Sequence, residues 1–207
     1  MHFLITAGGT REYIDPVRFI SNASSGKMGY ALARAALKAG HKVTLVTAPT
    51  ALREPSGVKV FKVETAAEMF QAVKKQFKNC NCLIMAAAVA DYAPSRPAKT
   101  KIKKTGKSLT LRLKPTTDIL QWAGRHKKKG QIVVGFALED KALRPRAERK
   151  MKEKNLDMII ANTTAAIAAE KSTVYIKTNC LAWLLFKNST KSDIAKRVVA
   201  LAERLSV

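Results

Sequence analysis

The stretch 20–40, ISNASSGKMGYALARAALKAG, places a glycine- and serine-rich loop directly before a helix-forming run. Backbone N–H groups at the start of a helix lack partners within it and carry the positive end of its dipole. Ser24 and Ser25 can cap the helix or donate to a phosphate. Gly26 permits close approach of the backbone to a ligand, and Lys27 adds a cation. The stretch therefore predicts an anion-binding loop around which the rest of the chain is organised.

Apolar strands and amphipathic helices alternate on both sides of this stretch. The continuous apolar run 82–90, CLIMAAAVA, is typical of a central strand buried on both faces of a parallel sheet. Strands are expected at 2–7, 43–46, 58–63, 82–90, 131–137 and 157–161, and helices at 26–39, 65–78, 142–154 and 193–205, with one more from 118. Two late strands, 173–176 and 181–186, flank a turn typical of a hairpin. The pattern predicts an α/β fold, a three-layer, Rossmann-like doubly wound and mostly parallel sheet with a C-terminal β-hairpin.

Residue types at the expected helix starts indicate how two of the helices begin. Thr65 and Glu68 have the spacing of a capping box. Thr116 or Thr117 is expected to cap the helix that begins at Asp118.

Three segments interrupt the alternation. Residues 10–25 show no periodicity and are expected to form an ordered functional loop. Residues 91–107 contain prolines and five lysines, which predicts a basic flap. Residues 108–114, SLTLRLK, alternate and predict a half-exposed strand. Without a linker or repeat, residues 1–207 are expected to form a single domain.

The net charge is extreme, at +23 from 38 Lys and Arg against 15 Asp and Glu. Such a field attracts nucleotides, phosphorylated metabolites or nucleic acid, and charge does not choose among them. A general surface bias of the host proteome explains it equally well.

The cysteines and the N-terminus bear on compartment. Cys80, Cys82 and Cys180 follow no disulfide framework, which favours reduced thiols. No zinc site is expected, because Cys80 and Cys82 have no second pair and no nearby histidine. The first apolar run is too short for a signal peptide, and no run approaches the roughly 18 apolar residues of a membrane span. We expect a cytoplasmic protein.

Two standard phosphate motifs do not match. A Walker A loop requires G-x-x-x-x-G-K-[ST], but Met28 follows Lys27 and Ser21 stands at the first glycine. The dinucleotide fingerprint requires G-x-G-x-x-G after the first strand and an acid after the second. Residues 8–10 lack that spacing, and residues 47–48 carry no acid. These mismatches weaken the hypothesis of a nicotinamide-dependent enzyme, which stays open as an alternative.

Other candidates have two interpretations each. The run 99–104, KTKIKK, is either a solvated charge run or a mobile flap that binds phosphates, with Asp91 before it on the ribose hydroxyls. Phe136 packs either on a base or in the core, and Trp122 and Trp183 are expected in the core. The sequence offers no Ser/His/Asp, Cys/His or paired-carboxylate arrangement. A sequence without these arrangements suits a reaction catalysed by positioning and by electrostatic stabilisation of phosphates.

Several stretches of the sequence resemble a known enzyme family. ITAGGTREYIDPVRFISNASSGKMGYALA, at 5–33, strongly resembles the phosphopantothenate–cysteine ligase family, also called phosphopantothenoylcysteine synthetase. Further matches cover nearly the whole chain: AAAVADY at 86–92, KIKK at 101–104, TDIL at 117–120, VVGFALE at 133–139 and KMKEKNLDMIIAN at 150–162.

The resemblance implies an enzyme of coenzyme A biosynthesis. A nucleoside triphosphate with Mg²⁺, CTP in most bacterial members and ATP in eukaryotic ones, activates the 4′-phosphopantothenate carboxylate as an acyl-nucleotidylate. The amine of L-cysteine then attacks it, giving 4′-phosphopantothenoylcysteine and the nucleoside monophosphate. No metal ligand from the protein is predicted.

The resemblance also implies site residues. Asn22 matches the asparagine that holds the carbonyl of the acyl intermediate, Arg18 the arginine of the second half-reaction, and Lys101 the flap lysine on the phosphates; Ala88 joins Arg18 and Asn22 in substrate binding. Nucleotide binding is implied, beside Lys101, for Ser24, Ser25, Gly26, Lys27, Met28, Met85, Ala86, Ala87, Ala88, Asp91, Thr117, Asp118, Ile119, Leu120, Phe136, Lys150 and Lys154.

Two departures from the family matter. Many bacterial members have Asn-Pro-Asp where this chain has Thr116-Thr117-Asp118, which leaves CTP or ATP preference open. Many are fused behind a flavin-dependent decarboxylase domain, whereas this chain starts at the ligase's first strand. A stand-alone ligase without FMN is therefore expected, and a separate decarboxylase partner stays open. Members are commonly homodimers, and residues 108–114 with the flap are an expected contact region.

Two functions of other classes stay as alternatives. One is an NAD(P)-binding Rossmann-type reductase, and the other a basic nucleic-acid-binding domain. The second would need a basic face interleaved with base-stacking aromatics, but aromatics are only 6% and do not interleave with the lysines. No specific nucleic acid and no membrane is expected as a partner.

Overall fold

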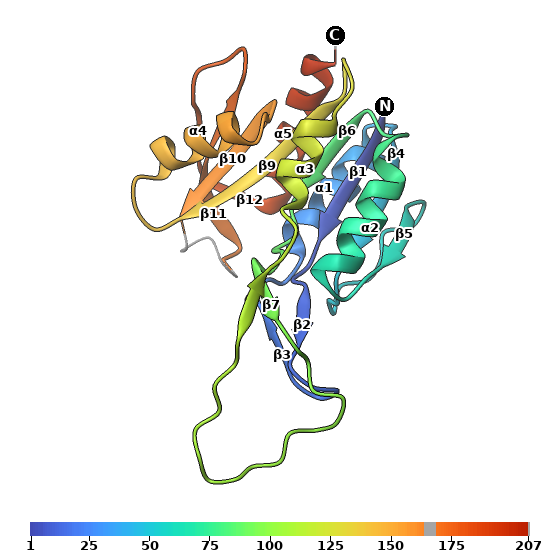
Figure 1. Cartoon of the computed structure of the whole chain (residues 1–207). Coiled ribbons are helices and arrows are strands. Elements are labelled where there is room, and N and C mark those ends of the chain that lie inside the picture. Colours follow the sequence, from blue (N-terminus) through green and yellow to red (C-terminus); the bar gives the residue numbers. More distant parts are fainter. Residues whose placement is uncertain (164–168, 207) are drawn as a thin grey trace.

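The computed structural model describes residues 1–163 and 169–206. Its body is built on a sheet of eight strands, from which an arm projects (Figure 1). In spatial order the strands are β12 (Leu184–Thr190), β11 (Lys171–Thr178), β10 (Met158–Thr163), β9 (Ile132–Glu139), β6 (Cys82–Met85), β1 (His2–Ala7), β4 (Lys42–Thr47) and β5 (Lys59–Lys62). The pairs β10–β11 and β11–β12 are antiparallel and the others parallel.

Helices cover both faces of this sheet. The helices α1 (Lys27–Lys38) and α5 (Lys191–Leu205) pack on one face. The helices α2 (Ala66–Phe77), α3 (Ile119–His126) and α4 (Leu143–Glu153) pack on the other. Residues 3–7 of β1 are all buried, since a central parallel strand has no solvent-facing side. The predicted three-layer α/β fold with a C-terminal hairpin is confirmed.

The centre of the body is closely packed where α1 crosses β1. A Cβ atom on Gly29 would lie 2.5 Å from the Cβ of Ala7 and 2.8 Å from the carbonyl oxygen of Thr6. Only glycine permits this approach, which fixes the start of α1 above the end of β1.

The helix caps differ in part from expectation. Thr65 caps α2 as predicted, its Oγ1 accepting from the Glu68 amide at 3.1 Å. Asp118 caps α3 in place of Thr116 or Thr117, because the Thr116 hydroxyl donates to the Ala90 carbonyl at 2.6 Å instead.

The α1 helix has no side-chain cap. Its N-cap is Gly26, with φ of +74°, and neither Ser24 nor Ser25 caps it. The Ser24 hydroxyl accepts only from the Gly26 amide, at 3.4 Å. The serine side chains therefore leave the first N–H groups of α1 without a cap.

The apolar run 82–90 does not continue as one strand. Its first four residues pair in the sheet as β6. Residues 86–90 then run beside the turn after β1, where an isolated parallel bridge joins Ala88 to Gly9. Ala88 N donates to the Gly8 carbonyl at 2.8 Å, and Ala90 N to Thr10 Oγ1 at 2.9 Å. Hydropathy alone does not reveal that the regular ladder ends at Met85.

The arm combines two antiparallel pairs from distant parts of the chain. One pairs β2 (Arg11–Tyr13) with β3 (Phe19–Ser21), and the other pairs β7 (Tyr92–Pro94) with β8 (Leu113–Pro115). We call residues 95–112 between β7 and β8 the flap. The loop predicted at 10–25 is thus a hairpin, and the strand predicted at 108–114 is wrong except at its last two residues. Three-residue strands are too short to show a period.

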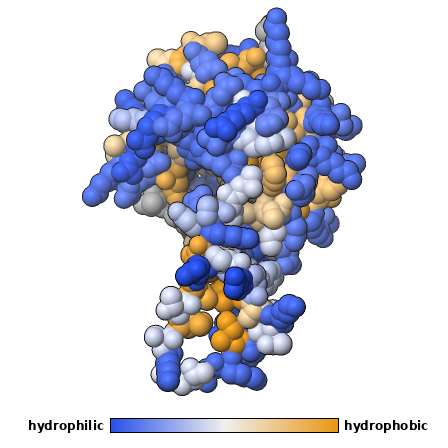
Figure 2. Space-filling view, in the orientation of Figure 1, coloured by the Kyte–Doolittle hydropathy of each residue, from blue (hydrophilic) through white to orange (hydrophobic). Residues whose placement is uncertain are grey.

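The arm exposes several large apolar side chains. Val17, Phe19, Tyr92, Leu109 and Leu113 are exposed there. Figure 2 shows this hydrophobic surface beneath a mostly hydrophilic body. In the described ranges, no helix combines the length and hydropathy needed to cross a membrane.

The aromatic residues predicted for the core lie at its margin. Trp122 is half-buried and packs edge-on against Phe70 and Phe77, and Trp183 is half-buried with its Nε1 donating to Glu148 at 2.8 Å. Phe136 is also half-buried, at the mouth of the cleft described next.

Candidate nucleotide site at the carboxyl edge of the sheet

A cleft of about 750 Å³ opens at the carboxyl ends of the central strands. It lies where the topology reverses, since β1 continues to β4 and β5 on one side while β6 leads to β9 and β10 on the other. Ligands of open α/β sheets bind at such a switch point. The cleft is therefore the candidate functional site.

One wall is the serine–glycine loop before α1. The Thr50 hydroxyl donates to the Ser25 carbonyl at 3.0 Å. A Cβ on Gly26 would lie 3.3 Å from the backbone nitrogen of Gly8, so the loop rests on the turn after β1. These contacts hold the start of α1 open toward the cleft, where its N–H groups favour an anion.

The alanine segment after β6 forms the floor. The Ala87 amide donates to Thr6 Oγ1 at 3.1 Å, which fixes this backbone to β1. Asn22 reaches the segment from the start of the serine–glycine loop, its Nδ2 donating to the Val89 carbonyl at 3.0 Å. With its NH₂ group held, the amide oxygen of Asn22 is oriented by the floor.

The far wall carries two lysines and an acid. Lys154 Nζ lies 2.7 Å from Asp118 Oδ2, and Lys150 Nζ donates to the Phe136 carbonyl at 2.8 Å. Burial lowers the pKa of Lys150, and the charge of Lys154 lowers it further. Burial alone would raise the pKa of Asp118, but Lys154, the Gln121 amide and Lys150 together hold it below its ordinary value. On this wall Asp118 balances the charge of Lys154, while Lys150 donates to a neutral carbonyl.

The cleft gathers nearly all of the residues that the sequence predicted for the site. They are Asn22, Ser24, Ser25, Gly26, Lys27, Met28, Met85, Ala86, Ala87, Ala88, Asp91, Thr117, Asp118, Ile119, Leu120, Phe136, Lys150 and Lys154. Their individual roles stay predictions.

Arg18 and Lys101 do not line this cleft. Both lie on the arm, where Lys101 is exposed in the flap. Arg18 pairs instead with the fully buried carboxylate of Asp15 and donates to the Ile102 carbonyl at 2.8 Å. Within one chain the arm carries Arg18 and Lys101 away from the cleft that Asn22 lines, and the roles of all three residues stay predictions.

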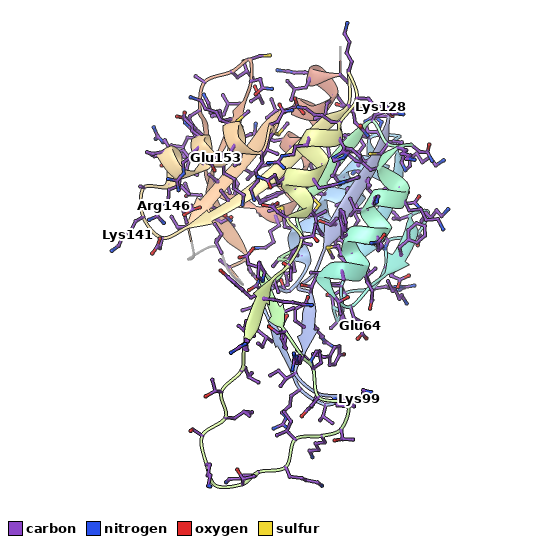
Figure 3. The ribbon with its side chains drawn as sticks, in the orientation of Figure 1. Glu64, Lys99, Lys128, Lys141, Arg146 and Glu153 are labelled. Atoms are coloured by element: carbon purple, nitrogen blue, oxygen red, sulfur yellow. The ribbon has the colours of Figure 1, made fainter. Side chains whose placement is uncertain are left out.

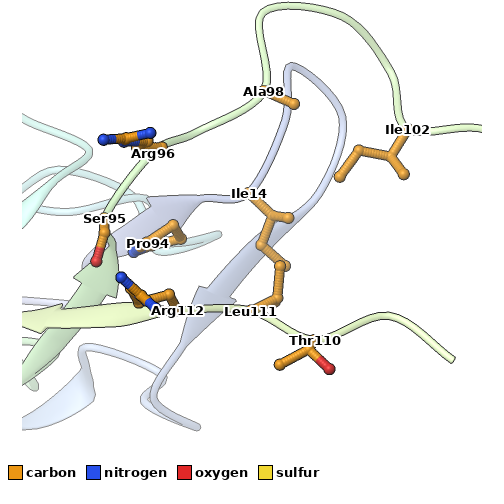
Figure 4. A pocket seen from close by; sticks show the side chains of 9 residues that line it. All are labelled: Ile14, Pro94, Ser95, Arg96, Ala98, Ile102, Thr110, Leu111 and Arg112. Carbon is orange, nitrogen blue, oxygen red and sulfur yellow. The ribbon is translucent and has the colours of Figure 1, made fainter.

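Asp15 ties the arm together. Its Oδ1 accepts from the Val17 and Arg18 amides, both at 2.9 Å, and its Oδ2 from the Ile102 amide at 3.1 Å. The Arg18 guanidinium and these amides hold the pKa of Asp15 far below its ordinary value. A second hollow of about 460 Å³ lies beside this contact, where Ile14, Ile102 and Leu111 face one another (Figure 4).

Basic groups elsewhere are spread apart. Figure 3 shows Lys99 on the arm, well separated from Lys141 and Arg146 on the body. Arg146 is neutralised locally by Glu139 and Asp140, at 3.1 and 3.2 Å.

Sequence reasoning assigned no role to three polar residues of the cleft. Asn162, Ser172 and Lys191 line it from the end of β10, the start of β11 and the first residue of α5. Asn162 carried a signal, since it ends a predicted strand. Ser172 and Lys191 carried none, because only the sheet order brings them to this edge.

The chemistry of the cleft is that of positioning. Over residues 1–163 and 169–206, no three His, Cys, Asp or Glu side chains form a metal-binding group. Cys80 and Cys82 are buried elsewhere as free thiols, and burial raises the pKa of the Cys80 thiol to about 11. The lining combines backbone amides, lysines and small side chains, which suit phosphates and a nucleotide base.

Comparison with known proteins gives consistent results. A family model described as the DNA/pantothenate metabolism flavoprotein C-terminal domain matches residues 1–205. The chain is 42% identical over 200 residues to the coenzyme A biosynthesis bifunctional protein CoaBC of Borreliella burgdorferi, covering 96% of this chain and 51% of that protein. It is 47% identical over 169 residues to the protein of the same name from Bacillus subtilis, covering 81% and 41%.

A solved structure agrees with these relatives. The crystal structure of the C-terminal domain of a coenzyme A biosynthesis bifunctional protein CoaBC superimposes with a TM-score of 0.86 at 38% identity, covering 99% of this chain and 94% of that one. The chain spans about half the length of the curated relatives that it matches.

Proposed function

The chain belongs to the family of the DNA/pantothenate metabolism flavoprotein C-terminal domain, and on that basis we propose that it joins 4′-phosphopantothenate to L-cysteine in coenzyme A biosynthesis. The observation that carries the proposal is the cleft at the switch point, lined by residues of every motif on which the resemblance rests except KIKK. The names of the relatives, which refer to coenzyme A biosynthesis, support the same pathway.

The proposed reaction has two steps. A carboxylate oxygen of 4′-phosphopantothenate attacks the α-phosphorus of a nucleoside triphosphate, and pyrophosphate leaves. The amine of cysteine then attacks the acyl carbon, and the nucleoside monophosphate leaves with the bonding electrons. Neither step requires a protein nucleophile, in keeping with a lining of amides and lysines.

The groups that line the cleft suggest which end of it takes the base and which end takes the phosphates. Phe136 offers a half-buried aromatic ring, and Asp118 and Lys154 add hydrogen-bonding groups to the same cleft, which suits the base. The loop 24–28 offers uncapped amides at the start of α1, which suits the phosphates. We assign Asn22, fixed by the Val89 carbonyl, to the acyl oxygen between them.

Mg²⁺ is proposed to enter with the triphosphate. This ion is usually held by one or two carboxylates together with substrate phosphates. Asp91 lines the cleft and stays proposed for the ribose hydroxyls, so no protein ligand to the ion is assigned. The ion would draw charge from the phosphates, while the protein supplies position.

The roles expected of Arg18 and Lys101 require both side chains to lie near a cleft, and in their own chain they lie on the arm. We propose a homodimer in which the arm of one copy reaches the cleft of the other. The exposed apolar residues of the arm, Val17, Phe19, Tyr92, Leu109 and Leu113, support a contact surface there. Light scattering of the wild type and of Phe19→Asp is expected to give a dimer and a monomer.

Three further points belong to the same proposal. We propose that residues 1–207 act as a single ligase domain in the cytoplasm. A separate decarboxylase stays open as a partner. We propose CTP as the nucleotide, with ATP as the alternative.

One assay tests the reaction. Pyrophosphate release is measured with CTP and with ATP in parallel, in the presence of Mg²⁺, 4′-phosphopantothenate and L-cysteine. Release is expected only when 4′-phosphopantothenate and a nucleotide are both present. No release above background with either nucleotide contradicts the proposed function.

Two variants test the site. Asn22→Asp and Lys101→Ala are expected to lower turnover by orders of magnitude while their unfolding midpoints stay near that of the wild type. Lys128→Ala, a lysine outside the cleft, is the matched control. Wild-type turnover in both Asn22→Asp and Lys101→Ala contradicts the site assignment and leaves the reaction itself standing.

A further inference from the structure

The lysines of the cleft fall into two pairs on opposite faces of the sheet. Lys150 and Lys154 belong to α4 and its end, on the face that α2, α3 and α4 cover. Lys27 and Lys191 are the first residues of α1 and α5, which cover the other face. All four line the cleft.

The two pairs differ in how their charge is balanced. In the first pair, Lys154 forms an ion pair with Asp118 at 2.7 Å and Lys150 donates to the neutral Phe136 carbonyl, so half of the charge is balanced. Within the described ranges, neither Lys27 nor Lys191 forms an ion pair with a carboxylate. The Lys191 ammonium donates to the Ala169 carbonyl, which carries no net charge. The α1–α5 side of the cleft is therefore positive and uncompensated.

The proximity of Lys27 and Lys191 is itself unfavourable. Burial lowers the pKa of Lys191, and repulsion by Lys27 lowers it further. Two like charges brought together beside a cleft are relieved when an anion binds between them.

Two neutral polar groups complete this corner. Asn162 and Ser172 come from the neighbouring strands β10 and β11 and line the same cleft. Both side chains are half-buried. An amide and a hydroxyl can donate to phosphate oxygens and so orient a group that lysines hold only by charge.

We propose that Lys191, with Lys27, Asn162 and Ser172, forms a phosphate subsite on the α1–α5 side of the cleft. Its ligand is a phosphate group, either the outer phosphates of the nucleotide or the phosphate monoester of the acid substrate. Lys191 is the residue that defines the subsite, since it alone brings a charge from α5. Only the assignment of the phosphate to a substrate rests on the proposed function.

The test compares phosphorylated ligands with their unphosphorylated counterparts. Calorimetry measures binding of CTP against cytidine, and of 4′-phosphopantothenate against pantothenate, with inorganic pyrophosphate as a separate probe. In Lys191→Met we expect at least one phosphorylated ligand to bind about ten- to hundredfold more weakly, the loss of one charged hydrogen bond. Weaker CTP and pyrophosphate binding assigns the subsite to the nucleotide, and weaker 4′-phosphopantothenate binding assigns it to the monoester.

Two variants serve as controls. Lys196→Met removes a lysine from the same helix that lies outside the cleft and contacts Asp193 at 3.4 Å, so it should bind all ligands as the wild type does. Lys191→Arg keeps the charge and is expected to restore most of the lost affinity. It also keeps the test valid if Lys191→Met unfolds.

Three results overturn the proposal. One is wild-type affinity of Lys191→Met for every phosphorylated ligand. Another is an equal loss in Lys196→Met, which would indicate a general charge effect. The third is an equal loss for cytidine or pantothenate, which would indicate a structural role. These binding measurements need no turnover, so they stay interpretable even if no pyrophosphate is released in the ligase assay.

Discussion

The cleft and the arm are made from adjoining stretches of the chain but are held in different ways. Asn22 and Arg18 are four positions apart, yet one is fixed to the floor of the cleft and the other to Asp15 on the arm. Cleft segments are anchored by backbone hydrogen bonds to buried strands. The flap is anchored to the hairpin where the Ile102 amide donates to Asp15, Arg18 donates to the Ile102 carbonyl, and the Ala98 amide donates to the Ile14 carbonyl. Residues of one motif can therefore belong to parts that are held by different contacts.

The largest expected effect is in the wall of the cleft. A Cβ on Gly124 would lie 1.8 Å from the carbonyl oxygen of Lys154, so Gly124→Ala forces α3 and the end of α4 apart. We expect the free energy of unfolding to fall by about 3 kcal/mol, as in severe overpacking. Denaturant unfolding measures it.

Gly106→Ala is the matched change on the arm. Gly106 has φ of +76° with open space around it, so only backbone strain of roughly 1 kcal/mol is expected. An equal loss of stability in both variants would contradict the contrast between a packed wall and an open arm.

The next largest effect is expected in the proteolysis of the flap. Asp15→Asn weakens the hydrogen bonds that join the hairpin to Ile102, so proteolysis within the flap should be several times faster than in the wild type. Glu12→Gln is the control, because Glu12 is buried in the same hairpin but accepts from the Ala66 amide on the body. Faster flap cleavage in Glu12→Gln as well would show that Asp15 has no special role.

The same contact predicts a pH dependence. Because the folded state holds the pKa of Asp15 far below its ordinary value of about 3.9, its contribution is complete above that value and is lost as pH falls below it. Flap protection measured by hydrogen exchange should stay constant from about pH 8 down to about pH 5. A loss near neutral pH would contradict this assignment.

A smaller effect is expected where the two regions meet. Thr116→Val removes the 2.6 Å hydrogen bond from the Thr116 hydroxyl to the Ala90 carbonyl, which joins the base of the arm to the cleft floor. The expected loss is about 1 kcal/mol of unfolding free energy. A loss as large as that of Gly124→Ala would mean that the junction is as tightly packed as the wall.

The smallest effect at neutral pH is expected for a buried lysine of the cleft. Lys150→Met gives up a hydrogen bond to Phe136 but also relieves the burial of a charge, so stability should change by less than about 1 kcal/mol. Affinity for nucleotide is nevertheless expected to fall.

The folded state holds the pKa of Lys150 below its ordinary value of about 10.4, so the wild type should gain stability relative to Lys150→Met as pH rises toward that value. Melting temperatures from pH 7 upward measure the difference, and parallel curves would contradict it.

Long elements were predictable from sequence because burial imposes a visible period. The apolar segment of β1 and the cap Thr65 follow from local residue types, whereas α1 begins after Gly26 without the side-chain cap expected from Ser24 or Ser25. The strands β2, β3, β7 and β8 are three residues each, too short to show a pattern. The run 82–90 misled because its last residues are also apolar, although beyond Met85 the pairing is reduced to a bridge between Ala88 and Gly9.

The residues that line the cleft were predicted from the family resemblance and not from local sequence patterns. The spacing Asp15-Pro16-Val17-Arg18 does contain a local signal, since an aspartate commonly accepts from amides two and three residues on. That signal would have indicated that Arg18 is paired within its own hairpin. Lys191 had no such signal, because its place beside Lys27 depends on the order of strands in the sheet.

The position of β6 has a consequence for how the protein is made. The strands β1, β4, β5 and β6 are complete once Met85 has been synthesised, but the partner of β6 on its other edge begins only at Ile132. A nascent chain therefore leaves the ribosome with an apolar strand edge that is open to pairing with other chains. The segment that follows it out is the lysine-rich flap. We expect its charge to keep neighbouring nascent chains apart until β9 closes the sheet.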